Sequence, residues 1–195
     1  MKYIERKTKR IFDITVALFC IVVFSPLYII CYIAIIIDDG RPALFSQERI
    51  GYKGKAFKIH KFRTMRLDAE ESGPQLYNDN DNRLTVVGSF LRRHHLDELP
   101  QMWNVLKGEM SFIGPRPERK YFIDKIMEHD SRYPMLYQLR PGVTSYATLY
   151  NGYTDTMEKM LRRLELDLYL EHNSLWFDAK ILLKTFYSIL FGKKF

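Results

Sequence analysis

The sequence predicts a helix-rich α/β protein with a short β-hairpin and an N-terminal segment that enters a membrane. Three observations support this fold class. They are a long uncharged apolar run near the N-terminus, two short extended segments joined by a glycine-containing turn, and several segments with apolar residues at helical spacing. A chain of 195 residues can form one domain with its own core in addition to an anchor. We therefore expect a membrane part over residues 1–40 and a second domain over residues 41–195.

The apolar run covers residues 14–37 and contains no charged side chain. At ~1.5 Å per residue, a straight helix of that length would cross a hydrocarbon core of ~30 Å. Pro26, preceded by Ser25, lies at the middle of the run, where a proline removes one helical hydrogen bond and bends the axis. Basic residues flank both ends, and such flanks prefer the cytoplasmic side. A kinked span and a helix that is broken at Ser25-Pro26 and leaves by the face it entered both fit this pattern.

The next segments predict a hairpin and a loop. Residues 43–50 and 56–62 read as an extended pair joined by residues 51–55, and their basic side chains suit either a solvated face or contact with lipid phosphates. Residues 68–82 are polar and rich in turn formers, which is typical of either a mobile loop or a lid.

Helical patterns cover much of the remaining chain. We expect helices near 89–95, over 98–107 with Gly108 as the stop, within 118–128, over 156–171 and over 175–190. The apolar stripe in 156–171 predicts core packing. The last helix is apolar along one side with lysines around it, so it is either an interfacial helix lying on a bilayer or a buried C-terminal helix.

The formal net charge of +7 indicates an anionic partner, which is nucleic acid, acidic lipid or a phosphate-bearing substrate. We expect no nucleic-acid partner, because the sequence contains no recognised nucleic-acid-binding module. The two cysteines, Cys20 and Cys31, both fall in the apolar run. Neither a disulfide framework nor a cysteine-based metal site is therefore supported.

The candidate catalytic residues are Asp97 and Glu98. Asp97 suits a helix N-cap and Pro100 a first helical turn, so one interpretation is simply a capped helix start. A helix N-terminus is also a phosphate site. Adjacent carboxylates on a helix point about 100° apart, so one can attack a phosphorus atom while its neighbour binds Mg²⁺. That division of roles suits phosphoryl transfer.

Four arginines are candidates for binding a nucleotide or phosphate. Two prolines bracket Arg116 in Gly114–Glu118, so little freedom is lost when its guanidinium binds an oxyanion, although a rigid exposed turn is the plainer interpretation. Arg92 and Arg93, just before the acidic pair, either reach the same site or face solvent. Arg140 stands in a loop with Pro141 and Gly142.

These segments together resemble the bacterial sugar transferase family, the monotopic phosphoglycosyl transferases that begin surface-glycan assembly. The resemblance extends over nearly the whole chain. It rests on KRIFDI (9–14), the Ser25-Pro26 break, QERIGYKGKAFKIHKFRTM (47–65), LRRHHLDELPQMWNVLKGEMSFIGPRPE (91–118), LRPGVTS (139–145) and DLYLEHNSLWFDAKILLKT (167–185).

The resemblance implies a reaction and roles for individual residues. Asp97 would attack the sugar-linked phosphorus of a UDP-sugar, expel UMP and carry the phosphosugar, which polyprenyl (undecaprenyl) phosphate would then accept. Glu98 would bind Mg²⁺ and Arg116 would contact the nucleotide or phosphate. The Ser25-Pro26 break would make the membrane helix re-entrant. The protein would then be monotopic on the bacterial inner membrane, with interfacial amphipathic helices and its catalytic domain, residues 41–195, on the cytoplasmic face.

Residues 146–155 depart from the continuation typical of larger relatives, so the sugar stays open. We also expect a minimal catalytic form that lacks the extra N-terminal transmembrane helices of those relatives. Two alternatives remain. One is a non-catalytic, membrane-anchored basic module that binds anionic lipid. The other is direct attack by lipid phosphate on the nucleotide sugar, without a covalent adduct.

Overall fold

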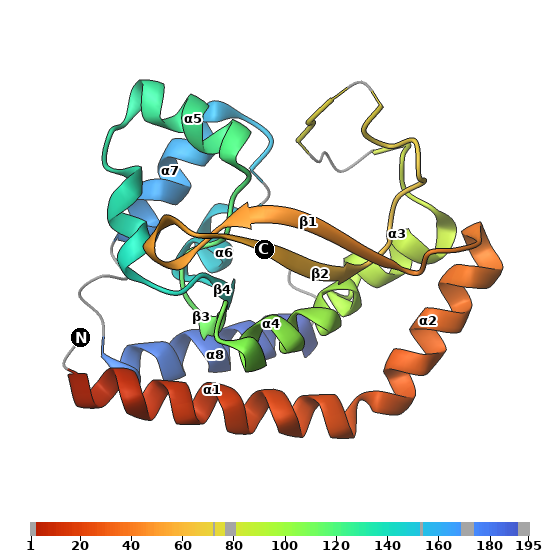
Figure 1. Cartoon of the computed structure of the whole chain (residues 1–195), viewed down its shortest axis with the longest axis horizontal. Helices are drawn as coiled ribbons and strands as arrows, with labels where there is room; N and C mark the ends of the chain where they lie inside the picture. The colour runs from red at the N-terminus through yellow and green to blue at the C-terminus, as the bar shows by residue number, and fades with distance from the viewer. Residues whose placement is uncertain (1–2, 72, 77–80, 153, 169–173, 191–195) are drawn as a thin grey trace.

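The computed structural model describes residues 3–71, 73–76, 81–152, 154–168 and 174–190 (Figure 1). Helices dominate, and two small sheets lie between them. In chain order, with η for a 3₁₀ helix, the elements are α1 (Tyr3–Val23), α2 (Ser25–Asp39), β1 (Leu44–Ile50), η1 (Tyr52–Gly54), β2 (Ala56–Phe62), α3 (Val86–Arg93), η2 (Leu96–Gln101), α4 (Met102–Lys107), β3 (Ser111–Ile113), α5 (Lys120–His129), η3 (Tyr133–Gln138), β4 (Gly142–Thr144), α6 (Tyr146–Asn151), α7 (Met157–Leu168) and α8 (Leu175–Leu190).

The apolar run is broken where the sequence predicts. The axes of α1 and α2 differ by 62°, and Pro26 stands in the first turn of α2, where its missing N–H is tolerated. Ser25 Oγ donates to the carbonyl of Val22 at 2.8 Å, which satisfies a group that the break releases. Among the described residues, no one helix is long and apolar enough to cross a membrane, whereas the bent pair meets both criteria together. The break is confirmed, and entry into a membrane from one face stays a prediction.

Polar side chains of α1 attach the helix to the rest of the molecule. Asp13, which is buried, accepts hydrogen bonds from Ser111 Oγ and from the backbone N–H of Phe112, both at 3.1 Å. Arg10 donates to the carbonyls of Val105 and Leu106 at the C-terminal end of α4. A helix end needs such donors for its last carbonyls. One side of α1 is therefore bound to α4 and β3, and its other sides remain outside the core.

The predicted hairpin is confirmed. Strands β1 and β2 pair antiparallel from Leu44 opposite Phe62 to Ile50 opposite Ala56, with the turn η1 between them. The buried side chain of Asn104 connects this hairpin to α4, because it accepts from the N–H of His60 and donates to the carbonyl of Lys58.

The other helices lie close to their predicted positions. Helix α3 begins at Val86, earlier than predicted, because Thr85 caps it by accepting from Gly88 N at 2.9 Å. Met160 and Leu164 of α7 are buried against α5, so the predicted core packing is confirmed. The predicted extension of this helix over 169–171 lies outside the described residues. The parallel pair β3–β4 and helix α6 were not predicted, since each is too short to show a pattern.

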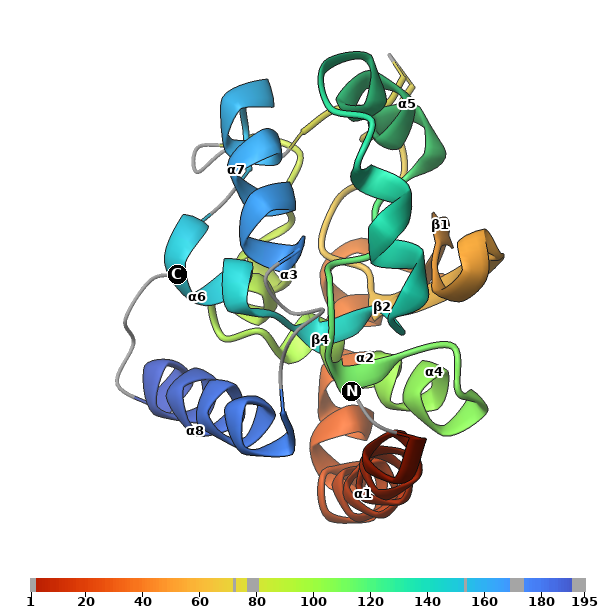
Figure 2. The ribbon, with the colours of Figure 1, turned by 90° about the vertical axis from the view of Figure 1, so that its left-hand side faces the viewer.

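Helix α8 lies beside α1 at the base of the molecule (Figures 1 and 2), and Lys9 of α1 pairs with Asp178 of α8. Ile181 packs into the core, whereas Trp176 and Leu183 are 69% and 70% exposed. The fully buried alternative for this helix is therefore wrong, because α8 keeps one apolar face outside the core.

Candidate active site

The acidic pair does not begin a regular helix, so the predicted N-cap role of Asp97 is wrong. His95 adopts a left-handed backbone with φ 55°, which turns the chain sharply between α3 and η2. Asp97 and Glu98 both lie inside η2, whose interior also contains Pro100. Because Pro100 supplies no N–H, the regular α-helical hydrogen bonds begin only in α4, at Met102.

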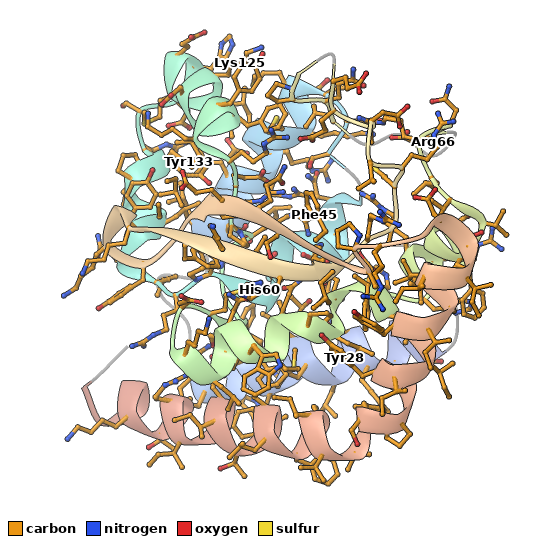
Figure 3. All side chains as sticks on the ribbon, turned by 45° about the vertical axis from the view of Figure 1, so that its right-hand side comes forward. Tyr28, Phe45, His60, Arg66, Lys125 and Tyr133 are labelled. Carbon is orange, nitrogen blue, oxygen red and sulfur yellow. The ribbon has the colours of Figure 1, made fainter. Side chains whose placement is uncertain are left out.

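A lysine on the hairpin contacts both carboxylates. Lys61 Nζ donates to Glu98 Oε1 at 2.6 Å and lies 3.9 Å from Asp97 Oδ2. Asp97 is 5% exposed, and of the nearby positive charges this ammonium lowers its pKa most. His60, which precedes Lys61 on β2, is labelled in Figure 3. The sequence did not single out Lys61, because it is one of many lysines in its segment and only the fold separates it from the others.

The pKa values of the two carboxyl groups are shifted in opposite directions. Burial raises the pKa of Asp97, the nearby charge of Glu98 adds to the rise, and Lys61 offsets part of it. Burial also acts to raise the pKa of Glu98, but Lys61 and Arg116 outweigh it, so that pKa is lowered. Two adjacent carboxyl groups with diverging proton affinities are suited to different roles, Asp97 as the more basic and Glu98 as the more strongly acidic group.

Arg116 and Arg92 join this group. Pro115 and Pro117 are buried, while the Arg116 side chain between them is 36% exposed. Its positive charge lowers the pKa of Glu98, and Arg92 has the same effect on Asp97, so both guanidinium groups act on the acidic pair. The structure thus gathers positive charge around two carboxylates from β2, α3 and the proline-bracketed turn.

The structure places the other candidates elsewhere. Arg93 is exposed on the last turn of α3. Arg140 Nε donates to the carbonyl of Gly108 at 2.9 Å, and its guanidinium lies over the ring of Tyr52. No contact between these two arginines and the acidic pair is present among the described residues. Their part in nucleotide binding stays a prediction.

The residues present fit a Mg²⁺ ion shared with a nucleotide. Nowhere in the described parts of the chain do three or more His, Cys, Asp or Glu side chains gather to enclose a metal. Mg²⁺ held between a protein and phosphates takes only one or two carboxylates. Glu98 suits that role, because its lowered pKa keeps it ionised and its side chain is 18% exposed.

Arg116 also belongs to an ionic cluster that the sequence does not predict, made of Glu118, Arg49, Arg116 and Arg163. Glu118 is buried and lies 3.4 Å from Arg49, 3.3 Å from Arg163 and 3.8 Å from Arg116. These residues come from β1, α7 and the turn, so no local spacing in the sequence relates them. The contact to Arg116 is made by its Nε atom. The Arg116 guanidinium therefore lies between Glu118 and the acidic pair, on which its charge acts.

Comparison with known proteins gives consistent matches. A family model described as bacterial sugar transferase matches residues 4–192. A UDP-N-acetylgalactosamine-undecaprenyl-phosphate N-acetylgalactosaminephosphotransferase of Aeromonas hydrophila is 40% identical over 185 residues, covering 94% of this chain and 44% of the relative. A UDP-glucose:undecaprenyl-phosphate glucose-1-phosphate transferase of Escherichia coli K12 is 38% identical, covering 93% of this chain and 40% of the relative. The enzyme of the same name from Caulobacter vibrioides is 40% identical, with 93% and 69% covered. The chain thus spans less than half the length of the first two relatives.

Proposed function

Because the chain belongs to the bacterial sugar transferase family, we propose that it transfers a sugar 1-phosphate from a UDP-sugar to polyprenyl phosphate and releases UMP. The relatives' names share undecaprenyl phosphate and differ in the sugar, which we therefore leave open. The observation that carries the proposal is the pair of the buried Asp97 and the partly exposed Glu98, with Lys61 and Arg116 acting on it. Such a reaction is the first membrane step of surface-glycan synthesis.

In the first half-reaction, a carboxylate oxygen of Asp97 attacks the sugar-linked phosphorus of the donor. A bond forms between that oxygen and the phosphorus, and the bond from the phosphorus to the bridging oxygen breaks. UMP leaves with the bridging oxygen, and the phosphosugar stays on Asp97 as an acyl phosphate. The raised pKa of Asp97 supports this role, because a more basic carboxylate is a better nucleophile.

In the second half-reaction, an oxygen of polyprenyl phosphate attacks the same phosphorus. The bond to Asp97 breaks, the carboxylate is restored, and the product is a polyprenyl diphosphate sugar. Neither half-reaction needs a net proton transfer. The two substrates can therefore use one site in turn, as in a ping-pong cycle.

The positive side chains stabilise the phosphates during both steps. Arg116 and Arg92 approach the acidic pair from two elements, and arginine binds phosphate oxygens through a planar fork. Lys61 neutralises the carboxylates, which lowers their repulsion of an anionic donor. Fixed positive groups of this kind assist phosphoryl transfer by holding the donor phosphates in position.

We assign Glu98 as the protein ligand of Mg²⁺. Bound there, Mg²⁺ would offset the negative charge that develops on the donor phosphates. In the structure, Lys61 holds the same carboxylate through one oxygen. Glu98 would thus be shared between the ammonium and the metal when the donor is present.

We further propose that the bent pair α1–α2 enters the inner membrane and leaves by its cytoplasmic face. The 62° bend, the apolar side chains exposed around it and the basic residues on both flanks support this topology. Replacing Cys20 and Cys31 by serine and adding one cysteine at Lys7 or Lys53 tests it. A membrane-impermeant thiol reagent should label both positions from the same face, and labelling from opposite faces would show a kinked span.

The proposed reaction is tested by measuring UMP release from a panel of UDP-sugars with Mg²⁺ and polyprenyl phosphate. Release by the wild type would identify both the reaction and the sugar, and a basic lipid-binding module would release none. Radiolabelled sugar phosphate should remain on the wild-type protein, and not on Asp97→Asn, when lipid is omitted. Turnover without such an adduct would favour direct attack by the lipid phosphate.

A further inference from the structure

A buried carboxylate in α7 holds the turn that contains Arg116. Asp167 is 1% exposed, and its Oδ2 atom accepts the backbone N–H of Arg116 at 3.3 Å. The Ser145 side chain and the N–H of Ala147 at the start of α6 also act on this carboxylate and lower its pKa. The hydrogen bond to Arg116 thus connects α7 to a turn that is distant in sequence.

The prolines beside Arg116 do not by themselves orient it. They fix the local backbone angles, whereas the direction of the whole turn depends on what holds it to the rest of the fold. Asp167 holds the backbone of Arg116, and Glu118 holds its Nε atom. Arg116, Glu118, Arg163 and Asp167 line one small hollow together with apolar side chains. Asp167 therefore acts on Arg116 from α7, and Glu118 acts on it from the turn itself while pairing with Arg163 of α7.

We propose that Asp167 is a positioning residue for the nucleotide donor: by fixing the backbone of Arg116, it aims the guanidinium at the donor phosphates. This inference rests on the proposed function. It gives α7 a part in donor binding, although Asp167 acts through Arg116 and does not itself touch the donor. Because Arg116 binds donor phosphates in the ground state and the transition state alike, its displacement weakens donor binding and leaves the chemical step nearly unchanged.

The surroundings of Asp167 make its hold on Arg116 sensitive to pH. Burial raises the pKa of Asp167 to about 6, against the opposing charge of Arg163 on the same helix. Glu118 and Arg116 face it from the turn, and Tyr133 (labelled in Figure 3) faces it from η3. Protonation removes the negative charge that attracts the Arg116 N–H. The two phosphates of a nucleotide sugar are diesters and do not titrate in this range, so the change lies in the protein.

The test is the KM–kcat split of Asp167→Asn. The amide lacks the negative charge that attracts the Arg116 N–H, so KM for the UDP-sugar should rise about tenfold. The turnover number and the KM for polyprenyl phosphate should stay within about twofold. In the wild type, KM for the donor should rise as the pH falls below about 6, and in Asp167→Asn this pH dependence should be absent. Asp130→Asn is the matched control, since the partly buried Asp130 also accepts a backbone N–H, that of Arg132.

A double-mutant cycle separates positioning from structural support. With Arg116→Ala in place, Asp167→Asn should raise KM no further, because both changes remove the same interaction. An additive rise, or a lower melting temperature with unchanged KM, overturns the inference. If Asp167→Asn does not fold, Ser145→Ala removes a hydroxyl that lowers the pKa of the carboxyl group, and it should raise KM in the same direction by about twofold.

Calorimetric titration with UDP repeats the comparison without turnover. UDP that binds the wild type and Asp167→Asn equally overturns the inference and leaves the proposed function standing. In another outcome, UDP binds the wild type, binds Asp167→Asn more weakly, and no donor gives UMP release by the wild type. That outcome supports the positioning role and overturns the proposed reaction alone.

Discussion

The surroundings of η2 and the base formed by α1, α2 and α8 differ in what they bury. Around η2 the molecule buries charge, with Asp97 and Glu98 packed against Lys61. At the base it exposes large apolar side chains, and Phe19 and Ile30 are each 63% exposed. Buried charge and exposed apolar surface are both unfavourable for a protein surrounded by water.

Both costs are offset if each region contacts something other than water. On the proposed function, a bilayer would cover the apolar side chains at the base, and anionic substrates would compensate the positive charge around η2. The regions are also joined, since Asp38 at the end of α2 accepts from the N–H of Val87 in α3 at 2.8 Å. Helix α3 leads directly into η2. The acidic pair is therefore held close to the segment proposed to enter the membrane.

The largest expected effect comes from a substitution that disrupts the charged region and leaves the apolar base unchanged. Asp97→Asn removes the proposed nucleophile and should lower UMP release by about 10⁴-fold or more. Sedimentation with lipid vesicles should be unchanged, because Asp97 is buried and adds nothing to the exposed apolar surface. Asp124→Asn, in an exposed ion pair with Lys120, is the control and should keep full activity. Substantial turnover by Asp97→Asn would remove Asp97 from the mechanism.

The next largest effect is expected from a substitution that disrupts the apolar base. Phe19→Glu places a charge on an exposed side of α1 and should weaken binding to lipid vesicles by about 3 kcal/mol, roughly a hundredfold. UDP binding in detergent should not change, since Phe19 lies outside the ionic cluster. Met135→Glu makes the same kind of change in η3, outside the base, and should leave vesicle binding unaltered. Equal losses in both variants would contradict a single membrane-facing side.

The two regions also differ in how far the sequence predicts them. The bent helix pair of the base could be predicted directly from the sequence, because an uncharged run and a Ser25-Pro26 break are local features that the structure retains. The hairpin was equally readable from its apolar segments and glycine turn. In both cases the information lies within a few residues of the element it determines.

The site around η2 was only partly readable. The identity of Asp97 and Glu98 was clear, but their backbone was not, because the left-handed His95 and the position of Pro100 produced a 3₁₀ turn instead of a capped helix. Lys61 and Asp167 act through contacts between segments far apart in the chain. No spacing rule relates such residues, so only the fold identifies them.

A comparison within the charged region sharpens the assignment of roles. Glu98 has a lowered pKa, so its ionised form stabilises the folded state above the unfolded pKa, and this contribution is lost as pH falls through the folded pKa. Asp97 has a raised pKa, so its ionised form opposes folding at neutral pH. Glu98→Gln should therefore lose about 2 kcal/mol, or about 4–8 °C in melting temperature, whereas Asp97→Asn should not lose stability. A larger loss in Asp97→Asn would reverse the two roles.

The smallest expected effect concerns α8, whose exposed face either belongs to the apolar base or only faces solvent. Trp176 is 69% exposed, and Lys180 Nζ lies 5.5 Å from the centre of its ring, a combination suited to the interface between lipid tails and phosphates. Trp176→Ala should weaken vesicle binding by about 1.5 kcal/mol, roughly tenfold, and leave UMP release in detergent unchanged. Tyr121→Ala, an exposed aromatic change in α5, serves as the control in the same vesicle assay. Unchanged binding by Trp176→Ala would confine the membrane-facing side to α1 and α2, so that only the bent pair would hold the acidic pair near the lipid substrate.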